Sequence, residues 1–314
     1  NGTITGGDRT VGLYGYGATL GATSNTTVGN GGTAVYSQGG NVTINGGTLT
    51  VGTEEAVGVY YLGSGGTITN NASTINIGDT SFGFVNVGSG NTLTSNTANV
   101  NLGNDSVYIY TTDGTGSVTN STNLTASGSR NYGIYSAGTI TNSGNMNFGS
   151  GIGNVGIYLT AGTASNTGAI TIGGSDLNAV DAAGNSKPLY GIGMATTSGS
   201  ITNASGGSIT VNGKNSIGMY AAGSGSTATN AGTIELNADN TTGIYVTDGA
   251  TATNSGTIKT GSGSYSNVVG VYLGENTTLN NTSTGVININ ATDGVGVYLK
   301  GGTIANYGTI TVSG

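Results

Sequence analysis

One short pattern, repeated through the whole chain, constrains the fold more than any other feature: an apolar residue, Gly, an apolar residue and then Tyr. Successive copies lie 22 to 27 residues apart, with a single interval of 37. Ten of the twelve Tyr positions hold Tyr, and the other two hold Val85 and Ala195. The twelve positions are Tyr14, Tyr36, Tyr60, Val85, Tyr110, Tyr135, Tyr158, Ala195, Tyr220, Tyr245, Tyr272 and Tyr298.

Two further patterns complete each repeat. The first is an apolar residue followed two positions later by Asn, as in Ile140 and Asn142; the second is a pair of alternating apolar residues, as in Ile170 and Ile172. Each repeat thus holds three short segments of period two, separated by Gly, Asn and Ser, which is typical of strands and turns. Three such strands bury a core only when they stack on identical neighbours. The sequence predicts an all-β fold: a single-stranded, right-handed parallel β-helix (β-solenoid) of about 12 coils of about 25 residues.

Alternation assigns faces to the first strand of each repeat. The residue just before each Tyr position is always apolar, and the residue two places earlier is apolar in ten repeats, so both columns are expected to face the core. The Tyr position and the Gly two before it are then expected to face outward. A column of Tyr rings can stabilise the stack by ring-on-ring contact, or it can form a contact surface for a partner. The uniform spacing favours stacking, and both interpretations stay open.

On a strand, residues two positions apart face the same side. The Asn of each second segment lies two residues after an apolar residue, so it is expected to point inward or to lie at a corner. Stacked Asn amides can donate hydrogen bonds to one another along the axis of the stack. The Asn column is therefore interpreted as structural; Ser95 is the exception to it.

The 37-residue interval between Tyr158 and Ala195 contains about twelve extra residues, placed at Gly173–Leu189. This stretch holds the one Pro of the chain and the charged residues Asp176, Asp181 and Lys187. Insertions in solenoids form protruding loops, often on the binding face, although a long loop without a partner also costs little free energy. Residues 1–314 are accordingly interpreted as one β-helix segment with a protruding loop at residues 173–189.

Composition argues against several functions. The chain has no His and no Cys, and only 6 basic and 13 acidic residues. It therefore lacks the commonest general base and any thiolate metal site. Glu54 and Glu55 are adjacent, but neighbours on a strand face opposite ways, which argues against a two-carboxylate site. No repeated calcium motif, basic stripe or long apolar run is present, so no cofactor, nucleic acid or membrane insertion of this segment is expected. We expect no catalytic residues and no enzyme activity.

The repeats Gly133–Phe148, Gly218–Leu236 and Gly296–Val312 follow the pattern G-I-Y-x-x-G-x-x-x-N-x-G-x-I-x-I closely. This pattern resembles the passenger domains of type V autotransporters, and most of all the very large Gly/Asn-rich, RadD-type adhesins of fusobacteria. The resemblance covers the chain except the insertion. It implies a virulence-associated adhesin exposed on the bacterial cell surface, secreted across the outer membrane and anchored there in the full-length protein by a C-terminal β-barrel that this segment lacks. It carries over no catalytic residue.

Three functions follow as hypotheses. The leading one is a segment of an adhesin passenger that attaches to a protein or glycan on host or other microbial cells. The second is a structural stalk or spacer with no ligand of its own, and the third, least favoured, is a polysaccharide-active β-helix enzyme. The chain begins and ends within the repeat pattern, at Asn1 and Gly314, so we expect it to be part of a longer protein. The candidate partner contacts are Asp176, Asp181, Lys187, Tyr135, Tyr158, Tyr220 and Tyr245.

Overall fold

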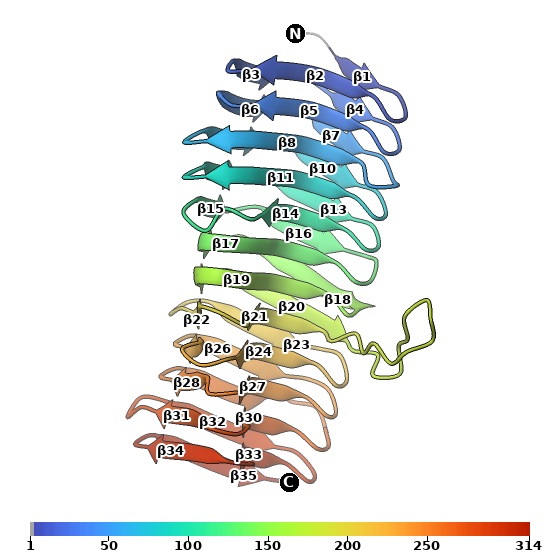
Figure 1. Cartoon of the computed structure of the whole chain (residues 1–314). Helices are drawn as coiled ribbons and strands as arrows, with labels where there is room; N and C mark the ends of the chain where they lie inside the picture. The colour runs from blue at the N-terminus through green and yellow to red at the C-terminus, as the bar shows by residue number, and fades with distance from the viewer. Residues whose placement is uncertain (1–2) are drawn as a thin grey trace. The chain divides into compact units, whose positions relative to one another are not determined.

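The computed structural model describes residues 3–314, so Asn1 and Gly2 lie outside the described residues. The described residues form β-strands joined by turns, and none of them forms an α-helix. A membrane-crossing helix is therefore absent from residues 3–314. The chain divides into two compact units, unit 1 up to Met146 and unit 2 from Asn147 to Gly314. Each unit is a stack of coils, and each coil contributes a first, a second and a third strand (Figure 1).

The strands of unit 1 pair in parallel with their counterparts one coil away, for example Tyr36 opposite Tyr60. The first strands are β2 (Val11–Tyr16), β5 (Thr33–Gln38), β8 (Val57–Ser64), β11 (Phe82–Ser89), β14 (Val107–Thr111) and β17 (Tyr132–Asn142). The second strands are β3 (Thr19–Ala22), β6 (Asn41–Asn45), β9 (Thr67–Asn71), β12 (Thr92–Ser95), β15 (Ser117–Asn120) and the end of β17. The third strands are β1 (Ile4–Gly6), β4 (Thr26–Val28), β7 (Thr48–Val51), β10 (Thr74–Ile77), β13 (Asn99–Leu102) and β16 (Asn123–Ala126).

Unit 2 repeats the arrangement, and β18 (Met146–Ile152) lies at the division between the units. The first strands are β19 (Val155–Asn166), β21 (Ile192–Thr196), β24 (Ile217–Ala222), β27 (Thr242–Thr247), β30 (Val269–Leu273) and β33 (Val295–Leu299). The second strands are the end of β19, β22 (Ser200–Asn203), β25 (Thr227–Asn230), β28 (Thr251–Asn254), β31 (Thr277–Asn281) and β34 (Gly302–Asn306). The third strands are β20 (Ala169–Gly174), β23 (Ser208–Val211), β26 (Thr233–Leu236), β29 (Thr257–Thr260), β32 (Val286–Asn290) and β35 (Thr309–Ser313).

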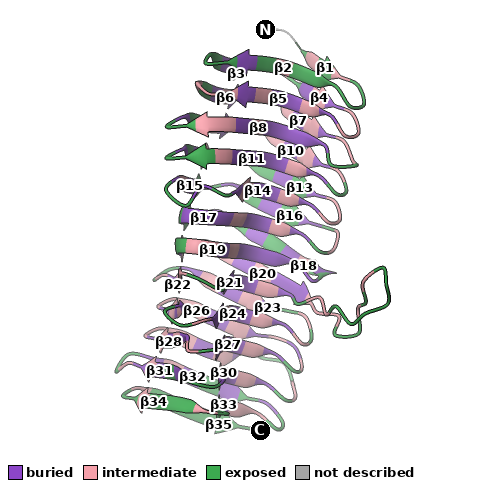
Figure 2. Cartoon of the chain, in the orientation of Figure 1, coloured by how far each residue is buried: buried purple, intermediate pink, exposed green. Residues whose placement is uncertain are grey.

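The predicted β-solenoid of about 12 coils is thus confirmed, since the strands stack in parallel coil on coil. First and second strands belong to one sheet and third strands to the other. The apolar side chains before the Tyr positions lie between these sheets; Ile157, Met219 and Val271 are fully buried. Figure 2 shows buried residues along most strands, and exposed residues in the turns and in the first and last coils, for example on β2 and β34.

Two expected facings are wrong: the Gly column faces inward, and the column just before Gly, expected to face the core, is half-exposed in most coils. In ten of the twelve coils the two residues before the Tyr position, such as Gly218 and Met219, are both buried, whereas Ile217 before them is half-exposed. The strand register skips the Gly position in both paired strands, so the regular alternation of faces is interrupted there. A Cβ on Gly218 would lie 2.6 Å from the Gly243 carbonyl oxygen and 2.9 Å from the Ile234 side chain. Gly fits at this inward-facing position because the third strand and the next coil fill the space where a side chain would lie.

Tyr108 occupies the Gly position of its coil, and this explains a second departure from the repeat. Because the position faces inward, the Tyr108 ring is buried and lies edge-on against Phe84, with centroids 5.7 Å apart. Its hydroxyl bonds the Ser95 hydroxyl and accepts a hydrogen bond from the Asn70 amide at 3.2 Å. Ser95 stands where most coils have Asn, and the shorter side chain leaves room for the Tyr108 hydroxyl. The two exceptions therefore form one polar cluster. Burial raises the pKa of Tyr108 above its ordinary value, and the hydrogen bonds of its hydroxyl offset only part of this rise.

The asparagine ladder, as we call the column of second-strand Asn residues, faces inward as expected. In unit 1 the side-chain amide of Asn120 donates to the side-chain oxygen (Oδ1) of Asn142 at 2.7 Å. In unit 2 the side-chain amide of every ladder Asn except the last, Asn306, donates to the side-chain oxygen of the ladder Asn in the following coil, at 2.7–3.0 Å. The members in unit 2 are Asn166, Asn203, Asn230, Asn254, Asn281 and Asn306. Hydrogen bonds between neighbouring coils thus satisfy polar groups inside the core.

Replacing Asn230 with Ala is expected to lower the stability of unit 2, because it removes the donor to the buried Asn254 side-chain oxygen. The Asn203 amide loses one acceptor but still donates to the carbonyl oxygens of Gly207 and Thr233. Each buried group left unpaired costs about 1–3 kcal/mol. Urea unfolding followed by circular dichroism measures the loss, and Thr229→Ala, on the half-exposed face of the same strand, is the matched control. Equal midpoints for the two variants would show that the ladder contributes nothing.

Candidate functional site

The tyrosine ladder, the stack of rings at the Tyr positions, lies on the outer face of the first strands. In unit 1 the Tyr14 and Tyr36 centroids are 5.5 Å apart, and those of Tyr36 and Tyr60 are 5.2 Å apart. In unit 2 the stack runs from Tyr220 to Tyr298 with spacings of 4.3–5.7 Å. The expected outward stacking is therefore present, and each stacked pair contributes about 0.5–1.5 kcal/mol.

Ala195 interrupts the ladder in unit 2. Strand register places Ala195 opposite Tyr158 on one side and opposite Tyr220 on the other, so the Tyr158 and Tyr220 positions are two coils apart. Two strand spacings are roughly 9.6 Å, about twice the separation of stacked rings in this unit. A hollow of about 460 Å³ lies here, which we call the Ala195 cleft. It is lined by Tyr158, Tyr190, Ile192, Ala195, Thr197, Ile217, Tyr220, Tyr245 and Thr247.

The cleft combines aromatic rings, apolar side chains and neutral hydroxyl groups. Ile192 and Ile217 reach it because the alternation of faces is interrupted at the Gly position, which leaves the residue before Gly half-exposed. Burial raises the pKa of Tyr245 to about 12, and the neighbouring Tyr272 adds to the effect. Burial, followed by the negative charge of Asp248, also raises the pKa of Tyr220. Both phenols therefore stay protonated at neutral pH and can donate as well as accept hydrogen bonds.

The insertion leaves the solenoid as an antiparallel excursion, residues 176–189, which projects from the yellow-green part of unit 2 (Figure 1). Asp176 and Leu189 close its base, since the backbone N–H of each donates to the carbonyl oxygen of the other at 2.8 Å. Gly173 and Gly174, predicted to be loop residues, belong to strand β20. On the excursion Leu177 and Val180 are 42% and 61% exposed.

The charged residues of the excursion shape its backbone. The Asp176 carboxylate accepts a hydrogen bond from the Asn178 N–H at 2.9 Å. The Asp181 carboxylate accepts from the N–H groups of Ala183 and Asn185, also at 2.9 Å. The Asn185 side chain and backbone lower the pKa of Asp181, and Lys187 contributes its positive charge. These Asp residues therefore hold tight turns.

The candidate contacts are thus distributed over both units. Tyr158, Tyr220 and Tyr245 line the Ala195 cleft together. Tyr135 lies in unit 1, where it stacks on Tyr110 at 5.4 Å and meets Tyr132 edge-on. Tyr190, which follows the excursion directly, lines the cleft and was not among the predicted contacts. The signal that could have found it is the coincidence of the insertion with the missing Tyr of the same repeat.

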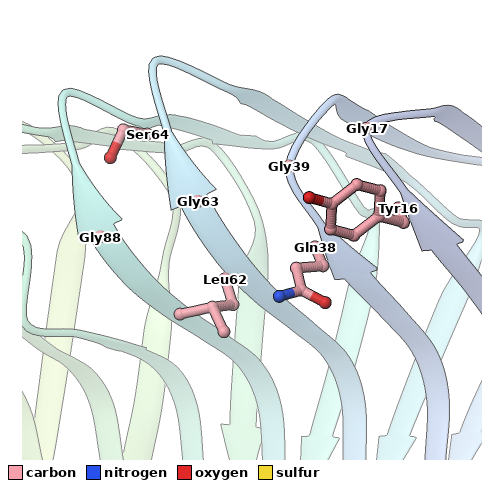
Figure 3. Close-up of a pocket in the computed structure, with 8 residues that line it drawn as sticks. All are labelled: Tyr16, Gly17, Gln38, Gly39, Leu62, Gly63, Ser64 and Gly88. Carbon is pink, nitrogen blue, oxygen red and sulfur yellow. The ribbon is translucent and has the colours of Figure 1, made fainter.

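A second hollow, of about 480 Å³, lies on unit 1 at the ends of its first strands. Figure 3 shows Tyr16, Gln38 and Leu62 along its rim, with glycines of successive coils between them. Tyr16 is the one aromatic residue of its lining and is 74% exposed. With one ring against four, this hollow offers far less enclosed aromatic surface than the Ala195 cleft.

Glu54 and Glu55 do not lie on a strand, contrary to expectation. Both residues lie in a turn with φ of 58° and 65°, not on a strand, so strand alternation does not separate their carboxylates. They line a hollow together with Arg9, Gly31 and Thr80. Within residues 3–314, no group of three or more His, Cys, Asp or Glu side chains is arranged to hold a metal ion.

Comparison with known proteins gives two similarities. Residues 149–257 match the family model of the BigA third pectate lyase-like domain, which spans about a third of the chain and includes the cleft-lining residues. A solved structure, the TibC-catalysed hyper-glycosylated fragment TibA55–350, is 20% identical over 99% of this chain and 100% of that one, with a TM-score of 0.31. A search of curated proteins finds no match. The BigA match is a similarity of fold and assigns no activity to this chain.

Proposed function

We propose that the chain is a segment of an adhesin-type autotransporter passenger, displayed on a bacterial cell surface, that attaches to host or other microbial cells. The resemblance of the repeats to autotransporter passengers supports this placement. A protein or glycan of the target cell is the proposed partner. We further propose that the segment is not an enzyme, because the chain has no His to act as a general base.

One observation carries the binding role: the excursion and the Ala195 cleft are continuous in sequence. The excursion presents exposed Leu177 and Val180, and the residue after it, Tyr190, lines the cleft. These apolar side chains stand on a projecting segment, where a partner can cover them. A segment that serves only as a spacer needs neither the apolar excursion nor the interruption of the ladder.

Deletion of residues 176–189 tests the proposal. The bridge between Asp176 and Leu189 brings the two cut points close together. Five residues then join Ile172 to Ile192, namely 173, 174, 175, 190 and 191, the same number as the five (212–216) that join Val211 to Ile217 in the next coil. We expect the purified chain to bind host epithelial or partner bacterial cells, and the deletion variant to lose most of that binding while keeping its β-sheet circular dichroism spectrum.

Leu177→Ser with Val180→Ser is the milder variant, since it changes only exposed side chains, and it is expected to weaken binding in the same direction. The matched control is Leu299→Ser, a similarly exposed apolar residue of unit 2 (46%) far along the sequence from the excursion. The spacer function would be favoured if the unmodified chain did not bind cells. It would also be favoured if neither the deletion of residues 176–189 nor the double substitution at Leu177 and Val180 reduced cell binding.

A further inference from the structure

We propose that the Ala195 cleft binds one pyranose ring of a neutral glycan, held between the Tyr158 and Tyr220 positions where the ladder lacks a side chain ring. This inference rests on the proposed function and names the ligand class for the same surface. Three features support it: the width of the gap, the side chains that line it, and the contrast with Val85, the other interrupted position of the ladder.

At the other interruption, Val85 in unit 1, a ring from the same strand lies against the neighbouring ladder Tyr. Phe82, three residues before Val85, contacts the Tyr110 ring edge-on with centroids 6.1 Å apart. At Ala195 the corresponding residue is Ile192, which has no ring to place in the gap. The Ala195 cleft is therefore not a general result of losing one Tyr. It arises from this combination of small and aliphatic residues beside Tyr190.

The lining matches the two kinds of surface on a pyranose ring. Its axial C–H groups form apolar faces that pack on aromatic rings, and Tyr158 and Tyr220 bound the gap on opposite sides. Its equatorial hydroxyls need donors and acceptors, and three of the lining residues, Tyr190, Thr197 and Thr247, carry hydroxyl groups that can serve as both. A purely hydrocarbon ligand would leave these hydroxyl groups without bonds, which disfavours it.

Charge selects a neutral glycan over an anionic one. None of the nine lining residues is Lys, Arg, Asp or Glu. The negative charge of Asp248 acts on Tyr220, a lining residue, where it adds to burial in raising the pKa of the phenol. A sialic acid or uronic acid would bring a second negative charge with no cation to pair it, and an unpaired charge in a partly enclosed site is unfavourable.

Saturation-transfer difference NMR on the full chain tests the proposal with lactose, maltotriose, cellotriose and chitotriose, and with 3′-sialyllactose as the anionic counterpart. We expect saturation transfer to the ring C–H protons of at least one neutral sugar and none to the sialic acid residue. Ala195→Tyr fills the gap with the residue that ten other coils carry, and should abolish the signal. Tyr220→Ser removes one wall and should weaken binding about tenfold.

Val85→Tyr is the matched control, because it completes the ladder in unit 1 and leaves the cleft unchanged; its binding should equal that of the unmodified chain. Should Ala195→Tyr fail to fold, as judged by circular dichroism, Tyr190→Ser provides the same comparison at a side chain that is 44% exposed. Absence of signal from all four neutral sugars, or a signal unaffected by Ala195→Tyr and Tyr220→Ser, overturns the inference. Cell binding that persists in Ala195→Tyr would overturn this inference alone and leave the proposed function standing.

Discussion

Val271→Asp is expected to unfold the coils around β30. Val271 is fully buried and lies in register between Ile244 and Val297, so a carboxylate there has no water and no cation beside it. Even when protonated, a buried polar group without a hydrogen-bond partner costs about 2–7 kcal/mol. Each coil contacts mainly its neighbours, so the loss should begin locally. Hydrogen exchange is expected to show deprotection of β27, β30 and β33 before the remaining strands of unit 2.

Asn276→Asp adds the same charge at an exposed turn residue with φ of 58°, where Asp is well tolerated, and should leave the exchange pattern unchanged. Because burial disfavours the ionised carboxylate, the folded-state pKa of the new Asp lies above its unfolded value. The penalty in Val271→Asp should therefore shrink as the pH falls towards about 4, the ordinary Asp value. Equal protection in Val271→Asp and Asn276→Asp at neutral pH would show that the interior tolerates charge.

Tyr108 and Ser95 are expected to show strong coupling in a double-mutant cycle. Tyr108→Gly restores the usual residue of that position but removes a buried ring, at a cost of about 3–5 kcal/mol. Ser95→Asn restores the ladder residue but forces a larger side chain against the Tyr108 hydroxyl, at about 1–3 kcal/mol. Made together, the two changes recreate the arrangement of neighbouring coils, because the ladder then continues without a break from Asn70 to Asn120.

The double variant should consequently be more stable than additivity predicts by at least about 1 kcal/mol. Urea unfolding of the four proteins gives this interaction energy. Thr94→Ala, which changes the half-exposed residue beside Ser95, combined with Tyr108→Gly serves as the control pair and should be additive. If Ser95→Asn with Tyr108→Gly were additive as well, the two exceptions to the repeat would be unrelated.

The repeat period makes much of this fold readable from sequence. Residues about 25 positions apart lie opposite one another, so a column in the sequence becomes a column in space, and Asn203 and Asn230 could be expected to meet. The repeat period does not predict the local path of the backbone within a coil. Simple alternation fails at Gly218 because two successive residues, Gly218 and Met219, face inward, and that error also hid the inward direction of Tyr108.

The candidate site was only partly readable for a similar reason. Tyr158, Tyr220 and Tyr245 follow from the ladder and were named together with Tyr135, which lies elsewhere. Tyr190 belongs to no column, since the excursion that precedes it has no counterpart in other coils. Its place beside the cleft depends on how residues 176–189 return to the solenoid, and periodicity carries no information about that path.

The asparagine ladder also gives the interior of unit 2 a direction. Every ladder amide from Asn166 to Asn281 donates toward the coil that follows it, so the amide dipoles are aligned head to tail along the stack. Aligned dipoles polarise one another and strengthen each successive bond. A coil stacked in the reverse sense would oppose donor to donor at this position. The ladder therefore favours one direction of stacking, in addition to holding neighbouring coils together.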